Sequence, residues 1–225
     1  MNTKISAALI IFTFLTVISS NKASSQTAAH TLFMETSKGN MKIILYEQTP
    51  MHADNFIKLV NDGTYNGVLF HRVIKGFMIQ TGDPDSKNAA KGALVGTGGP
   101  GYLVPAEFHP DLYHKNGALA AARQGDDTNP NRESNGSQFY IVQGEVFSDE
   151  QLDQMENAGA HIKFTAEQRM VYKAVGGAPH LDYGYTVFGE VIEGFEVIDA
   201  IAAEPTDERN RPLEDVIIIK ITVLE

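Results

Sequence analysis

The feature that most constrains this chain is a series of short runs of β-branched, aromatic and aliphatic residues, separated by turn-forming residues. Runs of this length and composition are typical of β-strands. The first two flank Ser37-Lys38-Gly39-Asn40, which predicts a β-hairpin. We therefore expect a mainly β fold. The predicted strands are Thr31–Thr36, Met41–Tyr46, Val68–Ile74, Phe77–Thr81, Ala118–Ala122, Ser137–Val142, Thr186–Val191 and Val216–Val223.

A few segments between these runs have helical spacing instead. After Thr49-Pro50, apolar residues recur every three to four positions as far as Asp62-Gly63, which predicts an amphipathic helix. Gly194–Ala202 predicts a second helix ahead of the last strand. The more polar stretch 145–178 contains Thr165-Ala166-Glu167-Gln168, a capping-box pattern. We expect this stretch to be a helical insertion.

The segment Asp83–Gly101 is so rich in glycine and proline that it predicts a long surface loop. Within it, Gly96-Thr97-Gly98-Gly99-Pro100-Gly101 matches the G-x-G-x-x-G pattern of dinucleotide-binding loops. The match follows no strong strand, opens no helix and is interrupted by Pro100. We therefore assign no dinucleotide site to it.

The N-terminal segment predicts an export signal. A positively charged start precedes the uncharged apolar run Ile5–Ile18, and small residues then predict cleavage before Gln26. A retained anchor is the alternative, but the run is shorter than the roughly 17–25 residues that span a bilayer. We expect residues 1–25 to be a signal peptide and 26–225 to be a single exported domain. Its expected location is the periplasm of a double-membraned bacterium, with no membrane span after cleavage.

Composition excludes several classes of function. The formal net charge of −10 and the lack of a basic run argue against nucleic-acid binding. The absence of cysteine excludes disulfides, cysteine-based zinc sites and a thiol nucleophile. His109, Asp111 and His114 are spaced closely enough to suggest a metal site, but surface exposure or a core hydrogen bond is commoner for such histidines. We expect no metal, no cofactor and a monomer.

Three blocks of the sequence resemble the cyclophilin family, in the family's order. They are Phe70–Asp83, Asn135–Ile141 and Tyr185–Gly189, and Tyr46–Gly67 is also similar to the family pattern. The resemblance covers about residues 30–225 and is interrupted by the predicted insertion. Similarity over this length is far more specific than any one motif.

The resemblance implies a closed eight-stranded antiparallel barrel capped by two helices, with the active site on the outer barrel surface. It also implies a peptidyl-prolyl cis-trans isomerase that accelerates rotation about Xaa-Pro bonds in exported proteins and assists their folding. The expected partners are proline-containing segments of unfolded or folding proteins. Two alternatives stay open: a module that binds such segments without useful turnover, and a general chaperone whose isomerase activity is incidental.

The resemblance implies Arg72 as the catalytic cation and Gln80 as the amide that orients it and the substrate. An arginine suits this role because its guanidinium stays protonated and presents several fixed donors. Phe77, Met78, Tyr140 and Leu181 are the implied proline pocket, with Phe139 behind them. The full set of implied substrate-binding residues is His71, Phe77, Met78, Ala122, Arg123, Gln138, Phe139, Tyr140, Leu181 and Tyr185.

Three features depart from the family pattern. His180 stands where many eukaryotic members have a tryptophan that grips cyclosporin, so we expect weak cyclosporin binding. Tyr140 stands where phenylalanine is commoner, and its hydroxyl needs water or a partner if it is desolvated. The insertion at 145–178 could shape access to the pocket, bind clients or only cover surface.

Overall fold

The computed structural model describes residues 28–158 and 163–224. The predicted signal peptide and the cleavage point before Gln26 lie outside the described residues. Within those two ranges, none of the helices is long and apolar enough to cross a membrane.

The fold is built on one antiparallel sheet of eight strands in the order β10-β1-β2-β9-β6-β8-β4-β3. The ends of this order are joined by backbone hydrogen bonds, because Phe70 N–H donates to Val216 and Ile218 N–H donates to Val68. The sheet therefore curls back on itself. Its strands are β1 (Ala28–Thr36), β2 (Gly39–Tyr46), β3 (Arg72–Ile74), β4 (Met78–Thr81), β6 (Ala118–Ala121), β8 (Phe139–Val142), β9 (Val187–Glu193) and β10 (Ile218–Leu224).

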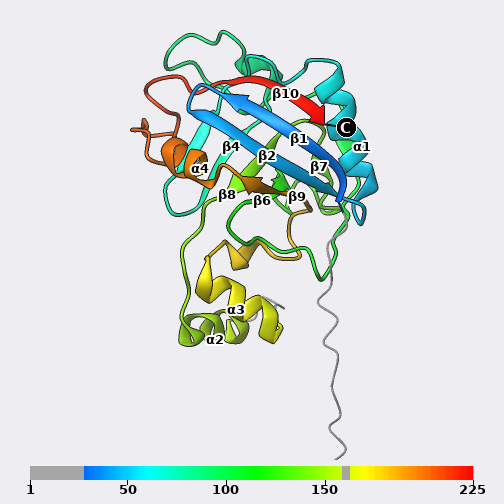
Figure 1. The fold of residues 1–225 in the computed structure, drawn as a ribbon, viewed down its shortest axis with the longest axis vertical. Helices are drawn as coiled ribbons and strands as arrows, with labels where there is room; N and C mark the ends of the chain where they lie inside the picture. The colour runs from blue at the N-terminus through cyan, green and yellow to red at the C-terminus, as the bar shows by residue number, and fades with distance from the viewer. Residues whose placement is uncertain (1–27, 159–162, 225) are drawn as a thin grey trace, which may run out of the picture.

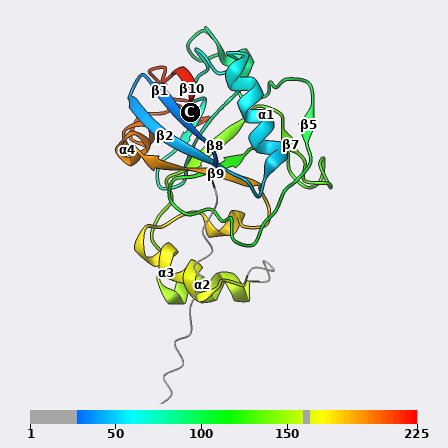
Figure 2. The same ribbon diagram turned by 45° about the vertical axis from the view of Figure 1, so that its right-hand side comes forward.

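Two helices, α1 (Pro50–Asn61) and α4 (Phe195–Ala202), lie on opposite sides of the curled sheet (Figures 1 and 2). Pro50 suits the first turn of α1 because an N–H at that position has no partner within the helix. Gly63, just beyond the helix, has a φ of 68° that most residues avoid. The predicted mainly β fold with two helices against an eight-stranded antiparallel sheet is confirmed.

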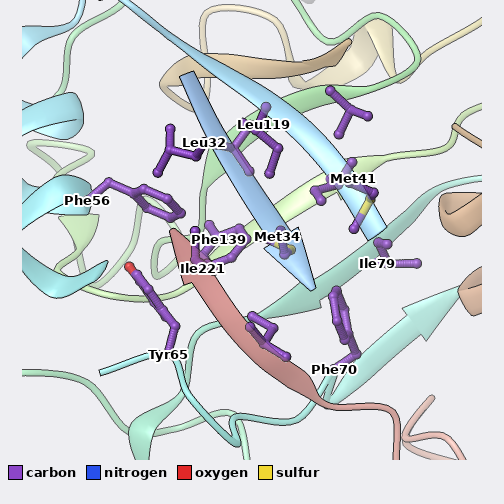
Figure 3. Packing of buried hydrophobic residues seen from close by; sticks show 14 of the residues in the cluster. Leu32, Met34, Met41, Phe56, Tyr65, Phe70, Ile79, Leu119, Phe139 and Ile221 are labelled. Carbon is purple, nitrogen blue, oxygen red and sulfur yellow. The ribbon is translucent and has the colours of Figure 1, made fainter. Parts of the chain in front are cut away.

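Aliphatic and aromatic side chains from both helices and the inner face of the sheet form the main core (Figure 3). The ring of Phe56 on α1 lies 5.0 Å from that of Tyr65 and 5.2 Å from that of Phe139, measured between centroids. Full burial of such a side chain contributes roughly 1.5–3 kcal/mol to stability. The packing of Phe139 anchors β8 against the core. The outer face of β8 carries part of the site described below.

Two details differ from the predicted strands. The strand predicted at Val68–Ile74 is interrupted, because its first half bonds to the start of β10 and only Arg72–Ile74 forms β3. A second sheet of two short strands, β5 (Leu103–Val104) and β7 (Ser134–Asn135), was not predicted, because two residues are too few to show an alternating pattern. The predicted loop Asp83–Gly101 also contains a short 3-10 helix, η1 (Pro84–Ser86).

The predicted insertion is a pair of helices, α2 (Asp149–Asn157) and α3 (Ala166–Ala174), that projects from the barrel (Figure 1). Both helices begin with a capping box, at Ser148 and Thr165. Arg169 on α3 forms ion pairs with residues of α2. Leu152 of α2 and Tyr172 of α3 belong to one small apolar cluster. The insertion is therefore an ordered unit with its own packing.

Candidate active site

The site lies on the outer face of the sheet because neighbouring side chains along a strand point to opposite faces. On β8, Phe139 and Ile141 belong to the main core, whereas Tyr140 and Val142 belong to a second apolar cluster. That second cluster is covered by the 3-10 helix η2 (Pro179–Leu181) and the residues after it. The prediction of a site on the outer surface agrees with this placement.

An open cavity of about 260 Å³ lies at the edge of the second cluster. Every residue that lines it belongs to the predicted catalytic and substrate-binding set. The lining residues are Arg72, Phe77, Met78, Gln80, Ala122, Arg123, Tyr140, Leu181 and Tyr185. We call Phe77, Met78, Tyr140 and Leu181 the apolar wall, and Arg72, Gln80 and the adjacent Gln138 the polar wall.

The polar wall is held by a relay of side-chain hydrogen bonds. Arg72 and Gln80 are direct partners on β3 and β4, and Arg72 Nη1 donates to Gln80 Oε1 over 3.2 Å. Gln80 Nε2 in turn donates to Gln138 Oε1 over 3.0 Å. Gln138 Nε2 donates to the carbonyls of Gly96 and Gly98, at 3.1 and 2.8 Å. Since only an amide nitrogen can donate to those carbonyls, the relay fixes the direction of both amides and turns the Gln80 oxygen toward Arg72.

The glycine-rich loop forms part of the support of this relay. Gly96 has a φ of 94°, and a Cβ there would lie 2.8 Å from Cδ2 of His71. The backbone N–H groups of Gly96 and Gly98 donate to the carboxylate of Asp83. The glycines that match G-x-G-x-x-G therefore allow the loop to approach His71 and Asp83 closely.

His71 lies outside the apolar cavity. It is buried and lines a smaller cavity of about 120 Å³, which it shares with Arg72 and Gln80. Burial lowers the pKa of the imidazole, so the ring is neutral near neutral pH. His71 therefore lies next to Arg72 in this smaller cavity and not in the apolar one.

The hydroxyl of Tyr140 has a partner within the protein. Tyr140 is buried, and its oxygen lies 3.0 Å from Nε2 of His114. His114 Nδ1 lies 2.9 Å from Oδ1 of Asp182, and the Tyr172 hydroxyl donates to Oδ2 of Asp182 over 2.6 Å. Burial raises the pKa of Tyr140, which therefore stays protonated.

Sequence reasoning did not connect His114 and Asp182 with the site. The two residues are 68 positions apart, and neither belongs to a local motif that marks a hydrogen-bonded pair. A core hydrogen bond or surface exposure was preferred to a metal site for His109 and His114, and His114 indeed forms buried hydrogen bonds. Nδ1 of His109 instead lies 3.9 Å from Asp111 on the surface. In the described ranges, no three histidine, cysteine, aspartate or glutamate side chains are grouped to hold a metal.

Ala122, Arg123 and Tyr185 complete the cavity rim. Ala122 N–H donates to Gln138, and the Ala122 carbonyl accepts from Asn135, so both backbone groups of Ala122 are paired within the protein. The Arg123 guanidinium lies 4.5 Å from the ring centroid of Tyr185. Arg123 Nη1 also lies 2.7 Å from a carboxylate oxygen of Asp126. The side chain of Arg123 is thus already bound within the protein.

Two further predicted residues lie beside the cavity rather than in it. Phe139 is buried in the main core, as expected for a residue that points away from its neighbour Tyr140 along β8. Gln138 lines a larger cavity of about 620 Å³, which shares Gln80, Ala122 and Arg123 with the apolar one. The two cavities are therefore adjacent on the surface.

Comparison with known proteins identifies the family. The family model for cyclophilin type peptidyl-prolyl cis-trans isomerases matches residues 31–223. The chain belongs to the cyclophilin family. Its activity is accordingly peptidyl-prolyl cis-trans isomerisation, and the predicted resemblance is confirmed.

Similar cyclophilins occur in other bacteria. A protein of Staphylococcus saprophyticus assigned as a peptidyl-prolyl cis-trans isomerase is 35% identical over 195 residues, which cover 86% of this chain and 91% of that protein. A Streptococcus pyogenes protein assigned as a bifunctional phosphatase and peptidyl-prolyl isomerase is also 35% identical, over 85% of this chain. This match spans only 38% of that longer protein.

Solved cyclophilin structures share the fold. The crystal structure of a Cryptosporidium parvum cyclophilin is 27% identical in sequence, with a TM-score of 0.62 over 87% of this chain and 98% of that chain. The same cyclophilin in the presence of the dipeptide Ala-Pro gives a TM-score of 0.61, with 27% identity over 87% and 99% of the two chains.

Proposed function

We propose that this cyclophilin accelerates rotation about Xaa-Pro bonds by donating a hydrogen bond from Arg72 to the prolyl nitrogen while the apolar wall holds the proline ring. The observation that carries this proposal is the presence of a hydrogen-bonded guanidinium beside an open apolar cavity. The Cryptosporidium parvum relative, which has been crystallised in the presence of Ala-Pro, supports a ligand of this chemistry.

The chemistry follows from the peptide bond. Rotation must overcome a resonance barrier of roughly 18–20 kcal/mol. In the twisted state the nitrogen lone pair is localised, so a donor aimed at that nitrogen stabilises the twisted state more than either planar isomer. The bonds from Arg72 to Gln80 and Met78 both run from Nη1, and the guanidinium has five N–H donors in all. This mechanism uses no nucleophile and no proton transfer.

We further propose that the substrates are exported proteins and that the enzyme acts in the periplasm as a monomer. The charged start and short apolar run before Gln26 support export. The absence of cysteine is compatible with an oxidising compartment, because no thiol is exposed to oxidation there. Mass spectrometry of the protein from fractionated cells tests this: a periplasmic form that begins at Gln26 is expected, and an intact membrane-bound leader would contradict it.

Arg72→Ala distinguishes the isomerase from the two alternatives. Exchange NMR on an Ala-Pro peptide should show a loss of turnover of about 10²–10³-fold, because one donor to the transition state is removed. Peptide affinity should change by less than about threefold, because the apolar wall is intact. Equal turnover in wild type and variant would refute the role of Arg72. A wild type that binds the peptide without turnover would indicate a binding module.

The chaperone alternative makes a different prediction. If suppression of aggregation is the main function, Arg72→Ala should suppress aggregation of an unfolded client and give as much folded client as the wild type does. We expect the variant instead to give less folded client at a fixed time, because it slows the refolding step that prolyl isomerisation limits.

A further inference from the structure

The hydrogen bonds behind Tyr140 form one continuous buried chain from the pocket to the insertion. Its members Tyr140, His114, Asp182 and Tyr172 are all buried. They lie on β8, in the segment before β6, just after η2 and on α3. The chain therefore joins four separate segments of the molecule.

The direction of each bond follows from the chemistry of the acceptor at its centre. Asp182 accepts from the backbone N–H of His114 at 2.9 Å and from the hydroxyl of Tyr172 at 2.6 Å. A carboxylate can only accept, so the Nδ1 of His114 at 2.9 Å must also donate to it. The Tyr140 hydroxyl, which keeps its proton because burial raises its pKa, lies 3.0 Å from the other ring nitrogen, Nε2, and completes the chain.

This chain fixes two residues of the apolar wall at once. Tyr140 is held through its own hydroxyl. Leu181 directly precedes Asp182, so the bonds to that carboxylate also fix the end of η2 that carries Leu181. On the other side, the backbone of Tyr172 is tied to the start of the insertion, because Phe147 N–H donates to its carbonyl.

We propose that the insertion determines the width of the proline pocket, with Tyr172, Asp182 and His114 as positioning residues for Tyr140 and Leu181. This inference rests on the proposed role of the apolar wall as the proline pocket. The insertion is then a specificity-determining part of the enzyme.

The proposal predicts an effect on binding more than on turnover. The proline ring occupies the pocket in both isomers and in the transition state, so a looser pocket weakens all three states together. Removing the Tyr172 hydroxyl leaves a buried carboxylate oxygen without its donor, and the chain must shift to compensate. We expect Tyr172→Phe to weaken binding of an Ala-Pro peptide about fivefold, with turnover at saturation changed by less than about twofold.

A double-mutant cycle with Tyr140→Phe tests the connection. If the chain transmits the effect, Tyr172→Phe should have a smaller influence on peptide affinity once the Tyr140 hydroxyl is absent, because only the part that passes through Asp182 to Leu181 remains. The same fivefold loss in both backgrounds would overturn the proposal, because it would show that Tyr172 does not act through Tyr140. No loss of affinity in a folded Tyr172→Phe protein would also overturn it.

Arg169→Gln provides the matched control. Arg169 lies on the same helix, three positions from Tyr172, and its ion pairs are with Asp149, Asp153 and Glu156 rather than with the chain. This variant should lower the thermal stability of the insertion and leave peptide affinity unchanged. An equal loss of affinity in Arg169→Gln would show that general loosening of the insertion, not the chain, is responsible.

Methyl NMR keeps the test informative if a variant loses stability. Resonances of Leu181 should shift in Tyr172→Phe and not in Arg169→Gln. Should Tyr172→Phe fail to fold, Tyr140→Phe perturbs the chain from its other end and should shift the same methyl groups. Unchanged Leu181 methyls in both tyrosine variants would contradict the proposal. These measurements do not depend on the test of Arg72→Ala. If Arg72→Ala turned over the peptide as fast as the wild type, the proposed catalytic role of Arg72 would be wrong, but the affinity and methyl results for Tyr172 would be unaffected.

Discussion

The polar wall and the apolar wall line the same cavity but are held in place differently. Arg72 and Gln80, which are partly open to solvent, and the buried Gln138 form a relay of side chains that ends on a glycine-rich loop. Tyr140 and Leu181 are fixed from behind by a fully buried chain that ends on α3. On the two proposals made above, the catalytic guanidinium is positioned by the side chains around it, whereas the shape of the binding pocket depends on a distant insertion.

The largest effect that would sharpen this comparison is expected from Arg72→Lys. Lysine keeps the charge but replaces a fixed planar fork with one mobile ammonium, so the bond to Gln80 no longer aligns the donor. We expect turnover to fall about 10²-fold, with peptide affinity nearly unchanged. Single-turnover exchange measurements at saturating peptide check this. If affinity falls as much as turnover, the two walls do not have separate roles.

A smaller effect is expected from Phe77→Ala on the apolar wall. Loss of the ring should weaken peptide binding about tenfold, because roughly 1–3 kcal/mol of apolar contact is lost, and turnover at saturation should be retained. Calorimetric titration measures the affinity. Phe139→Ala is the control, since this core residue should cost about 3–5 kcal/mol of unfolding free energy. A large loss of stability in Phe77→Ala would mean that Phe77 is structural.

The smallest effect is expected from pH. A guanidinium stays protonated at all physiological pH values, and burial lowers the pKa of His71, so its ring is neutral above pH 6.5. We expect kcat/KM to vary less than about twofold between pH 6.5 and 9. A bell-shaped profile in that range would show that a titrating group takes part and would break the assignment of Arg72 as the sole charged donor.

The polar wall could be predicted from sequence because its main residues are close together along the chain. Arg72 and Gln80 lie on two adjacent strands of one motif, so a single hairpin brings them into register. The apolar residues Phe77 and Met78 come from the same segment. The two helices and the insertion were also predictable, because helical spacing and capping boxes are local signals.

The support of the apolar wall could not be predicted in the same way. The sequence indicated that the Tyr140 hydroxyl needed a partner, but nothing local pointed to His114, which lies 26 positions away. Asp182 and Tyr172 meet only because α3 packs back toward η2. The short strands β5 and β7 were missed for a related reason, since their pairing depends on tertiary contacts. The weak cyclosporin binding expected from His180, whose ring lies 5.3 Å from that of Phe77, stays a prediction.

The neighbouring positions of β1 and β10 have a consequence for how the protein is made. Thr31 pairs with Leu224, so the sheet is completed by strands from near the two ends of the described chain. A contact of such long range forms late and cannot form on a ribosome that has not yet released the C-terminal strand. The nascent polypeptide therefore lacks a finished barrel until that strand is released, and on the proposed export this is a state that a translocation channel can accept.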